Sequence, residues 1–263
     1  MELSGRTVLI TGASGGIGQA LTRDATARGA QVHITARRTD VLTSLAQETG
    51  AELLTADLAD RGDVEHLAER FSDVDIVVAN AALPGSGALD SFAPEDLDRA
   101  IDVNLRVPML LARLLAPKMV ERGAGHLVFV SSLLGKATSP GSSVYCATKF
   151  GLRGFGQALR ADLRGTGVGV SVVFPGFVSD AGMFHESGAK LPPFVRTVTP
   201  EAVAAATFDA VARDRGEVDV APLTLRLGVK FSELAPGLAA RASDRLGAHK
   251  IASQLSDGQR DKR

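Results

Sequence analysis

Residues 7–18 read TVLITGASGGIG and decide the fold. Their first five residues, Thr7 to Thr11, are apolar and β-branched, which predicts a strand, and a helical pattern follows the last glycine. Glycines permit a tight turn and let main-chain N–H groups approach a pyrophosphate, which the dipole of the next helix attracts. We therefore expect this turn to bind a nucleotide phosphate, with the contacts made at Gly12, Ser14, Gly15, Gly16 and Gly18.

The spacing of these glycines differs from the two best-known phosphate-binding patterns. It does not fit Gly-x-Gly-x-x-Gly, and the absence of a Lys-Ser/Thr pair excludes a Walker loop. A connection between a strand and a helix, with no ligand, is the alternative interpretation of such a turn. Motifs elsewhere in the chain are needed to choose between phosphate binding and a simple connection.

Six further strand patterns alternate with helix-length segments along the chain. This alternation predicts an α/β fold, a doubly wound parallel sheet of about seven strands flanked by helices on both faces (Rossmann fold), as a single domain over residues 1–255. Ligands of such sheets bind beyond the carboxyl ends of the strands. The expected strands are Gln31–Ala36, Glu52–Ala56, Val74–Ala79, His126–Val130, Val168–Phe174 and Glu217–Val220.

Composition narrows the class of function. The 263 residues carry 29 Lys+Arg and 30 Asp+Glu, a formal net charge of −1, so we expect no binding to nucleic acid. Cys146 is the only cysteine, which rules out an intrachain disulfide and favours a cytoplasmic location. No apolar run is long enough to span a bilayer, so membrane contact is not expected. The five histidines show no metal-site spacing, and we expect no metal.

The second predicted strand ends at Ala36 and is followed by Arg37 and Arg38. A carboxylate at this place would hold the ribose hydroxyls of NAD, whereas a guanidinium suits a 2′-phosphate. NADP(H) is therefore the expected cofactor, and NAD(H) is disfavoured. The alternative is that both arginines are ordinary solvated residues after a strand.

A long helix is predicted from Glu95 to Glu121, after Pro94. Pro108 interrupts it, and because proline has no N–H, the main-chain carbonyl of Asn104 should lack its helical donor, with a kink nearby. Such a carbonyl can hold a water molecule.

The last third of the chain is less regular. Glycines and prolines over residues 177–198 predict a loop or short helices that form a substrate lid. An apolar segment with interleaved basic residues follows at about 223–255; packing within the fold or an oligomer is favoured over a role at a substrate pocket or a membrane surface. Residues 256–263 are expected to fray.

Tyr145 and Lys149 are one turn apart on a predicted helix and so share a face. A free tyrosine ionises only near pH 10, but an adjacent ammonium and a positive oxidised nicotinamide ring both favour the tyrosinate. Ser132, at the end of the fifth strand, can hydrogen-bond a substrate oxygen. Each residue also has an ordinary structural interpretation: an amphipathic helix face for Tyr145 and Lys149, and a helix cap or turn for Ser132.

Together these motifs resemble those of the short-chain dehydrogenase/reductase family over about residues 6–184. The resemblance is carried by the glycine turn and by residues at the ends of successive strands or on the following helices, namely Asp57, Asn80 with Ala81, Asn104, Ser132, Tyr145 with Lys149, and Pro175 with Gly176. It implies that Tyr145 is the general acid/base, that Ser132 positions the substrate oxygen and that Lys149 also binds the nicotinamide ribose. It further implies that Asn104 holds a relay water through its main-chain carbonyl.

The same resemblance assigns further cofactor contacts: Asp57 and Leu58 at the adenine, Ile17 at the pyrophosphate, Asn80 in the adenosine ribose region, and Pro175, Gly176 and Val178 at the nicotinamide. The chain departs from the family pattern at Ala82, where a glycine is usual, and at Asp180, where a threonine is common. An ionised Asp180 can only accept hydrogen bonds. Either it accepts from the carboxamide NH2 or Ser179 replaces the threonine, and we expect weaker ordering of the cofactor.

These patterns predict an NADP(H)-dependent oxidoreductase of the alcohol dehydrogenase or carbonyl reductase type. A noncatalytic NADP(H)-binding sensor or scaffold, or non-redox chemistry on the same fold, is the alternative. The pocket is expected from residues 133–142 and 177–197, where apolar side chains favour an apolar alcohol or carbonyl substrate: Leu133, Leu134, Phe177, Phe184 and Phe194. The resemblance also implies a homodimer or homotetramer through the helices that bear Asn104 and Tyr145.

Overall fold

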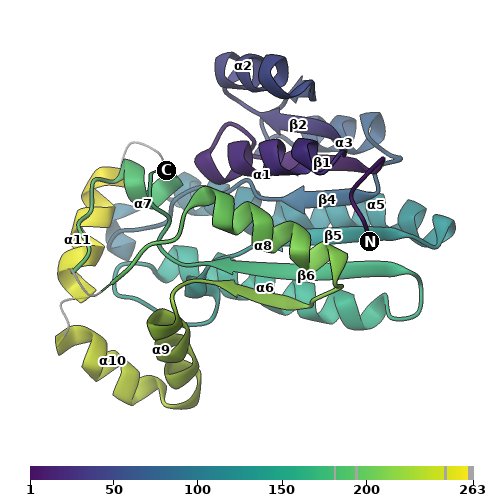
Figure 1. Ribbon diagram of the computed structural model, residues 1–263. Helices are drawn as coiled ribbons and strands as arrows, with labels where there is room; N and C mark the ends of the chain where they lie inside the picture. Colours follow the sequence, from purple (N-terminus) through teal and green to yellow (C-terminus); the bar gives the residue numbers. More distant parts are fainter. Residues whose placement is uncertain (181, 193–194, 246–247, 260–263) are drawn as a thin grey trace.

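A parallel sheet of seven strands forms the centre of the molecule, and its strand order is β3-β2-β1-β4-β5-β6-β7 (Figure 1). The computed structural model describes residues 1–180, 182–192, 195–245 and 248–259. The predicted α/β fold is confirmed, and the strand boundaries agree with the sequence patterns to within two residues. The strands are β1 (Thr7–Thr11), β2 (Gln31–Ala36), β3 (Glu52–Thr55), β4 (Ile76–Ala79), β5 (Gly125–Val130), β6 (Val168–Pro175) and β7 (Glu217–Val220).

Helices cover both faces of the sheet. The helices on the first two thirds of the chain are α1 (Gly16–Ala27), α2 (Thr39–Thr49), α3 (Arg61–Arg70), α4 (Pro94–Ile101), α5 (Val107–Arg122) and α6 (Ser143–Asp162). They are followed by α7 (Gly182–Glu186), α8 (Pro200–Ala212), α9 (Leu223–Leu234), α10 (Pro236–Arg245) and α11 (Ala248–Gln259), with short helical turns at η1 (Leu89–Ser91), η2 (Asp102–Arg106) and η3 (Leu133–Gly135).

Alternate residues of each central strand enter two separate apolar cores, because side chains in a strand point to opposite faces in turn. Val8 and Ile10 of β1 pack with α1, α2 and α8, whereas Leu9 packs with α3, α5 and α6. The sheet is therefore the middle layer of three and is buried on both faces, as expected for a parallel sheet with crossover helices.

The long helix that the sequence predicts is broken where Pro108 was expected to break it. Helix α4 ends at Ile101, a π-helical turn occupies η2, and α5 then continues to Arg122. In η2 the Val107 N–H donates to the carbonyl of Asp102, five residues back. Because Pro108 has no N–H to give to Asn104, the local widening of the helix has a covalent cause.

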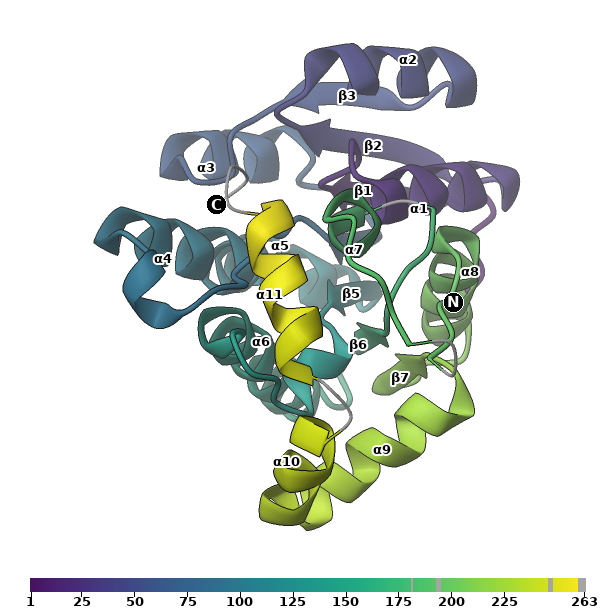
Figure 2. The ribbon, with the colours of Figure 1, turned by 90° about the vertical axis from the view of Figure 1, so that its left-hand side faces the viewer.

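The C-terminal segment wraps around one side of the sheet. Helices α9 and α10 lie beyond β7, and α11 returns across the carboxyl ends of the strands (Figure 2). One face of α9 is buried through Val229, while Leu223, Leu227 and Leu234 are exposed. Packing within the fold therefore covers only part of this apolar segment.

The first residues of the polar tail belong to the last helix. Residues 256–259 were expected to fray but continue α11, and residues 260–263 lie outside the described residues. The side chain of Gln259 is buried and donates to the carbonyl of Met183 at 3.0 Å. This contact spans 76 residues and so leaves no local signal in the sequence.

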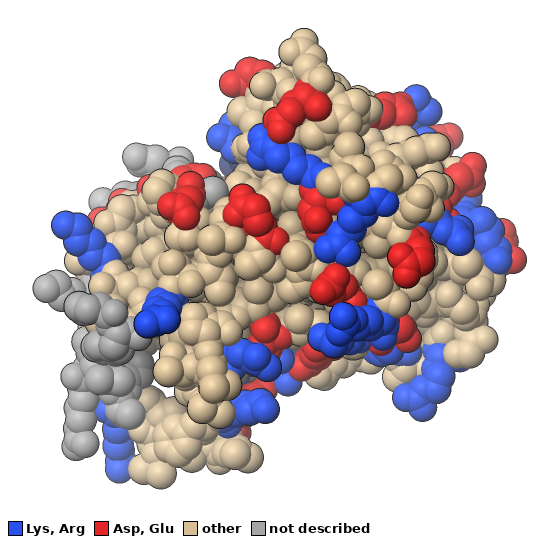
Figure 3. Space-filling view, viewed as in Figure 1, with Lys and Arg blue, Asp and Glu red and all other residues tan. Residues whose placement is uncertain are grey.

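Positive and negative side chains are intermixed on the face shown in Figure 3. This distribution agrees with the small formal net charge of −1.

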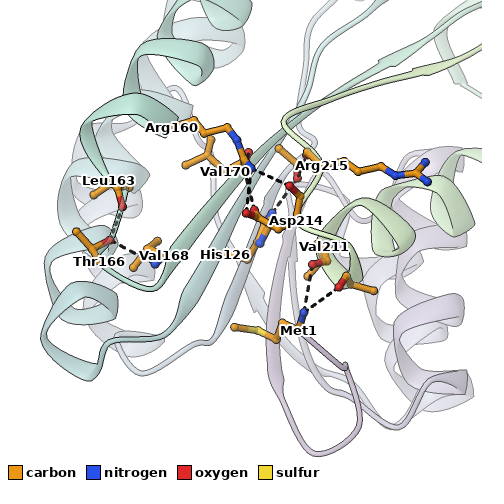
Figure 4. Close-up of polar contacts among 12 residues, drawn as sticks. Met1, His126, Arg160, Leu163, Thr166, Val168, Val170, Val211, Asp214 and Arg215 are labelled. Atoms are coloured by element: carbon orange, nitrogen blue, oxygen red, sulfur yellow. Dashed lines mark hydrogen bonds and ion pairs between the residues drawn. The ribbon is translucent and has the colours of Figure 1, made fainter.

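A buried histidine lies at the amino end of the sheet, opposite the end at which parallel sheets bind ligands (Figure 4). His126 of β5 is 2% exposed, and its Nε2 is 2.8 Å from the hydroxyl of Ser171 on β6. Asp214 lies nearby and is held by Arg160 through bonds of 2.7 and 2.9 Å. Burial lowers the pKa of His126 to about 4, although the Asp214 carboxylate acts in the opposite direction.

This lowered pKa predicts a specific loss of stability in acid. Because the unfolded chain binds a proton near pH 6.5 and the folded chain only near 4, the stabilising contribution is complete above pH 6.5 and falls between these values. We expect the wild type to lose up to about 3 kcal/mol more than His126→Gln between pH 7 and pH 4. Urea unfolding of both proteins across this range measures the difference, and parallel stability curves would contradict the assignment.

Candidate active site

The predicted site residues come together at the carboxyl ends of β1, β4, β5 and β6. The strand order reverses its direction of winding between β1 and β4, which pair in parallel from Val8 with Ile76 to Ile10 with Val78. Crevices at such a switch point are where open α/β sheets bind their ligands. The glycine turn follows β1 at this point.

The glycine turn has room for backbone but not for side chains. Gly12 has φ of +66°, and a Cβ there would lie 2.7 Å from the Cα of Ala81. A Cβ on Gly18 would lie 2.3 Å from the carbonyl oxygen of Gly12. Both positions therefore require glycine, and the turn packs directly on the segment after β4.

The first turn of α1 is open to an anion. Gly15 is the N-cap and supplies no side-chain cap, and the first turn contains no acidic residue. The unpaired N–H groups and the positive end of the helix dipole thus meet no negative group of the helix itself. This arrangement fits the pyrophosphate of a dinucleotide.

Arg38 is linked to the same turn. Its Nε lies 3.3 Å from the hydroxyl of Ser14, and its terminal NH2 donates to the Ser14 carbonyl. Arg37 is exposed and has no hydrogen bond or ion pair with any described residue. The Arg38 guanidinium therefore lies against the turn, on the side of β2, where a 2′-phosphate would be expected, and Arg37 is its neighbour in the sequence.

Asn80 connects β4 to β1. Its Nδ2 donates to the carbonyls of Thr11 at 3.0 Å and of Gly12 at 3.2 Å. The hydroxyl of Thr11 in turn accepts from the main-chain N–H groups of Asn80 and Ala81, both at 3.1 Å. Thr11, a buried threonine at the last position of β1, thus holds the two strand ends together, although it was not among the predicted site residues.

Asp57 and Leu58 follow β3. The Asp57 carboxylate accepts from the N–H of Ala59 at 3.1 Å, while its own N–H donates to Asp63 at 2.8 Å. Leu58 is only 6% exposed. Both residues are held in a defined turn beside the β2 end of the site, and Leu58 offers little free surface.

Tyr145, Lys149 and Ser132 are brought together as predicted. Tyr145 and Lys149 lie on α6, and Ser132 caps η3 immediately after β5. Lys149 is 1% exposed, its Nζ donates to the carbonyl of Val130 at 2.9 Å, and it lies 5.5 Å from the centre of the Tyr145 ring. Tyr145 is half-buried and shares a hydrogen bond with Ser132.

The expectation that Lys149 lowers the pKa of Tyr145 is wrong for the chain without cofactor. Burial raises the pKa of the Tyr145 phenol to about 12, although the hydrogen bond with Ser132 acts in the opposite direction. Burial also lowers the pKa of the Lys149 ammonium to about 7. Lys149 has therefore lost its own positive charge at the pH at which the tyrosine ionises, and it contributes little attraction for the tyrosinate.

Asn104 is 1% exposed and lies in the π-helical turn η2. Its side chain is fully engaged with the main chain of Leu83: Oδ1 accepts from the N–H at 2.6 Å and Nδ2 donates to the carbonyl at 2.9 Å. The sequence pattern indicated a role only for the main-chain carbonyl of Asn104. The side chain has a separate role, because it attaches the loop after β4 to the helix that packs against α6.

The segment after β6 forms the remaining wall. The N–H of Gly176 donates to the carbonyl of Val220 at 3.0 Å, and Val178 pairs with Val198 in an isolated bridge. The rings of Phe177 and Phe184 lie 5.0 Å apart at the base of the predicted lid. Pro175 is the last residue of β6 and is buried.

Asp180, the main departure from the family pattern, is exposed and has φ of +62°. Aspartate tolerates this left-handed conformation better than a β-branched threonine does, so the residue type suits the backbone at this position. The hydroxyl of Ser179 lies 3.3 Å from the carbonyl of Val198 and is thus already engaged within the lid.

An open hollow of about 480 Å³ lies in the lid and is lined by Phe184, Ala189, Leu191, Val195, Arg196 and Thr197. Of the residues expected to favour an apolar substrate, Leu133 is buried and Leu134, Phe177 and Phe184 are half-buried, while Phe194 lies outside the described residues. The lining of this hollow is therefore mostly apolar and includes one exposed arginine, Arg196.

The described residues contain neither a metal-binding cluster nor a membrane-spanning helix. Over these residues, no group of three or more histidine, cysteine or acidic side chains is arranged to hold a metal ion. In the same part of the chain, no helix is both long enough and apolar enough to cross a membrane.

The fold and the site define the class of dinucleotide-binding α/β oxidoreductases. A family model described as short chain dehydrogenase matches residues 6–192. Nodulation protein G of Rhizobium sp. (strain N33) is 36% identical over 186 residues, which cover 68% of this chain and 76% of that protein. The ketoacyl reductase HetN of Nostoc sp. (strain PCC 7120 / SAG 25.82 / UTEX 2576) is 33% identical over 227 residues, or 83% of this chain and 79% of that protein.

Solved structures agree with these matches. A short-chain dehydrogenase from Sphingobium yanoikuyae, in complex with NADPH, has a TM-score of 0.76 and 27% identity and covers 91% of this chain and 96% of that chain. The chain therefore belongs to the short-chain dehydrogenase/reductase family. The match to the family model ends before α8, so α8 to α11 and β7 follow the matched region.

Proposed function

We propose that this protein is an NADPH-dependent carbonyl reductase that converts an apolar carbonyl compound to an alcohol, with Asn104, Ser132, Tyr145 and Lys149 as its catalytic residues. The observation that carries the proposal is the joint placement of the phenol of Tyr145, its hydrogen bond with Ser132 and the buried amine of Lys149 at the carboxyl end of the sheet. HetN, which shares 33% identity, is named a ketoacyl reductase.

In this proposal the protein residues orient the substrate oxygen and transfer the proton to it. NADPH, when bound, supplies the hydride. Ser132 donates to the substrate oxygen and holds it next to the phenol, and Tyr145 gives its proton to the same oxygen as negative charge develops there. Lys149 uses its remaining N–H groups for the nicotinamide ribose, since one already binds Val130. The main-chain carbonyl of Asn104 holds a water that returns the proton.

Reduction requires the protonated form of Tyr145. With a pKa of about 12 the phenol is protonated at neutral pH and ready to act as an acid. Oxidation of an alcohol would require the tyrosinate, which burial opposes until the positive ring of oxidised cofactor is present.

The proposed cofactor contacts extend from the adenine to the nicotinamide end of the site. The pyrophosphate binds at Gly12, Ser14, Gly15, Gly16, Ile17 and Gly18, the 2′-phosphate at Arg37 and Arg38, and the adenosine at Asp57, Leu58, Asn80 and Ala81. Tyr145, Lys149, Pro175, Gly176, Val178 and Asp180 contact the nicotinamide side. The complex of the Sphingobium relative with NADPH supports NADP(H) over NAD(H).

We further propose a cytoplasmic homodimer or homotetramer that uses the helices bearing Asn104 and Tyr145. Four large apolar side chains on α4, α5 and α6 are substantially exposed: Ile101 at 46%, Met109 at 41%, Val120 at 37% and Phe150 at 39%. A second copy would cover them.

The first experiment is a turnover screen of aldehydes, ketones and alcohols with NADPH and NADH. We expect turnover of apolar carbonyl compounds with NADPH, and we expect Tyr145→Phe to lower kcat by about 100-fold or more, because the proton donor is lost. NADPH fluorescence titration should give a similar Kd for both proteins. Intact turnover in Tyr145→Phe would contradict the mechanism. NADPH binding without turnover of any compound would favour the alternative function, a noncatalytic NADP(H)-binding sensor or scaffold.

The second experiment tests the choice of cofactor. Arg37→Ala should weaken NADPH binding by about tenfold and leave NADH binding nearly unchanged, because only NADPH carries the phosphate that the guanidinium group contacts. Arg61→Ala is the matched control, since Arg61 is exposed on α3 and pairs with Glu65. An equal loss of affinity for both nucleotides in Arg37→Ala would show that Arg37 does not contact the 2′-phosphate.

A further inference from the structure

A buried lysine lies four residues after Ser132, and no step of the proposed mechanism uses it. Lys136 is 7% exposed. Its Nζ lies 2.7 Å from Oδ1 of Asp219 and 2.9 Å from Oε2 of Glu217, both on β7, and 3.9 Å from the centre of the Phe174 ring. Burying an ammonium costs free energy unless its partners are held in place, so the burial of Lys136 at this position requires a physical explanation.

The turn that carries Ser132 is short and internally bonded. The hydroxyl of Ser132 accepts from the N–H of Leu134 at 3.2 Å, and the carbonyl of Ser132 accepts from Gly135 at 2.8 Å. The N–H of Lys136 donates to the carbonyl of Leu133 at 3.0 Å. A displacement of Lys136 is thus transmitted through the turn to Ser132.

The residue that precedes this turn, Ser131, is hydrogen-bonded to α6, the helix that carries Tyr145. The hydroxyl of Ser131 donates to the carbonyl of Lys149 at 3.1 Å. A Cβ on Gly135 would lie 2.7 Å from the same carbonyl oxygen, so the turn and α6 are in direct backbone contact. The turn is therefore held on one side by α6 and on the other by the ion pairs of Lys136 with β7.

The carboxylates that hold Lys136 are themselves connected to α6. Arg153, one turn after Lys149, donates from Nε to Oε1 of Glu217 at 2.8 Å and also pairs with Glu233 of α9. Although burial opposes ionisation, hydrogen bonds from Arg153 and Lys136 keep the pKa of Glu217 below its ordinary value. A continuous set of charged groups thus joins η3, β7, α6 and α9.

We propose that Lys136 is a positioning residue that fixes Ser132 relative to Tyr145, by tying the turn after β5 to Glu217 and Asp219 of the edge strand. It has no contact with substrate or cofactor in this account and acts only through Ser132. The inference builds on the proposed function, but its first test needs neither substrate nor cofactor.

The first test uses the fact that Tyr145 is the only tyrosine of the chain. Tyrosine labelled with 13C at Cζ gives one resonance, which reports the hydrogen bond between Tyr145 and Ser132. Ser132→Ala should shift it, and Lys136→Met should shift it in the same direction, because the hydroxyl leaves its place. Arg28→Met, which breaks ion pairs with Asp24 and Asp209 on the other face of the sheet, is the control and should leave it unchanged.

Removal of the ammonium alone leaves Asp219 without a cation and Glu217 with Arg153 only, and this charge imbalance can unfold the chain. The variant Lys136→Met with Glu217→Gln and Asp219→Asn removes this charge imbalance and should show the same shift. A resonance that stays at the wild-type position in the charge-balanced variant overturns the proposal. A resonance that Ser132→Ala itself leaves unmoved does so as well, since no hydrogen bond is then present to be positioned.

The second test is a double-mutant cycle on kcat with a substrate from the screen. Lys136→Met should lower kcat by about tenfold in the wild type and have little effect in Ser132→Ala, because its action passes through Ser132. An equal loss of kcat in both backgrounds would mean that Lys136 acts on the fold in general and would overturn the proposal. If the wild type turns over no substrate, the proposed function fails, and the resonance test still decides the role of Lys136.

Discussion

The parallel pairing of β1 with β4 is the constraint on which the rest of the site depends. It brings the end of β1 next to the segment after β4, and the hydroxyl of Thr11 closes this junction by accepting two main-chain N–H groups. A Cβ on Gly12 would collide with Ala81 at 2.7 Å, so the glycine turn fits only this arrangement. The open first turn of α1 and the catalytic cluster then face the same end of the sheet.

Burial sets the chemistry of the cluster. Lys149 and Asn104 are each 1% exposed, and both use hydrogen bonds to the main chain of neighbouring segments, Val130 for the first and Leu83 for the second. These bonds satisfy polar groups that would otherwise be costly to bury. They also hold α6, β5 and the loop after β4 in one arrangement. The same burial keeps Tyr145 protonated, which suits a proton donor.

The parts of this structure that could be predicted from the sequence are those with a local pattern. Alternating strand and helix segments give the sheet, because burial on both faces produces apolar runs such as Thr7 to Thr11. Pro108 gives the break in the long helix, since a missing N–H is a property of the residue itself. Tyr145 with Lys149 is one helical turn and also visible locally.

The parts that could not be predicted depend on contacts between distant residues. Lys136 meets Asp219, 83 positions away, and nothing near Lys136 in the sequence indicates a buried ion pair. Asn104 contacts Leu83 through its side chain, which the spacing of motifs does not encode. The pKa of Tyr145 also depends on such contacts: the local pair with Lys149 predicts a lowering, whereas tertiary burial of both side chains produces a rise.

Direct titration of Tyr145 tests the central claim that burial keeps the proton donor protonated until oxidised cofactor binds. Because the chain has one tyrosine and no tryptophan, the resonance of 13Cζ-tyrosine follows this one phenol from pH 6 upwards. The account predicts a midpoint above the ordinary value of about 10 in the ligand-free protein, and a lower midpoint when NADP+ is bound. A ligand-free midpoint at or below 10, or one that NADP+ leaves unchanged, would contradict it.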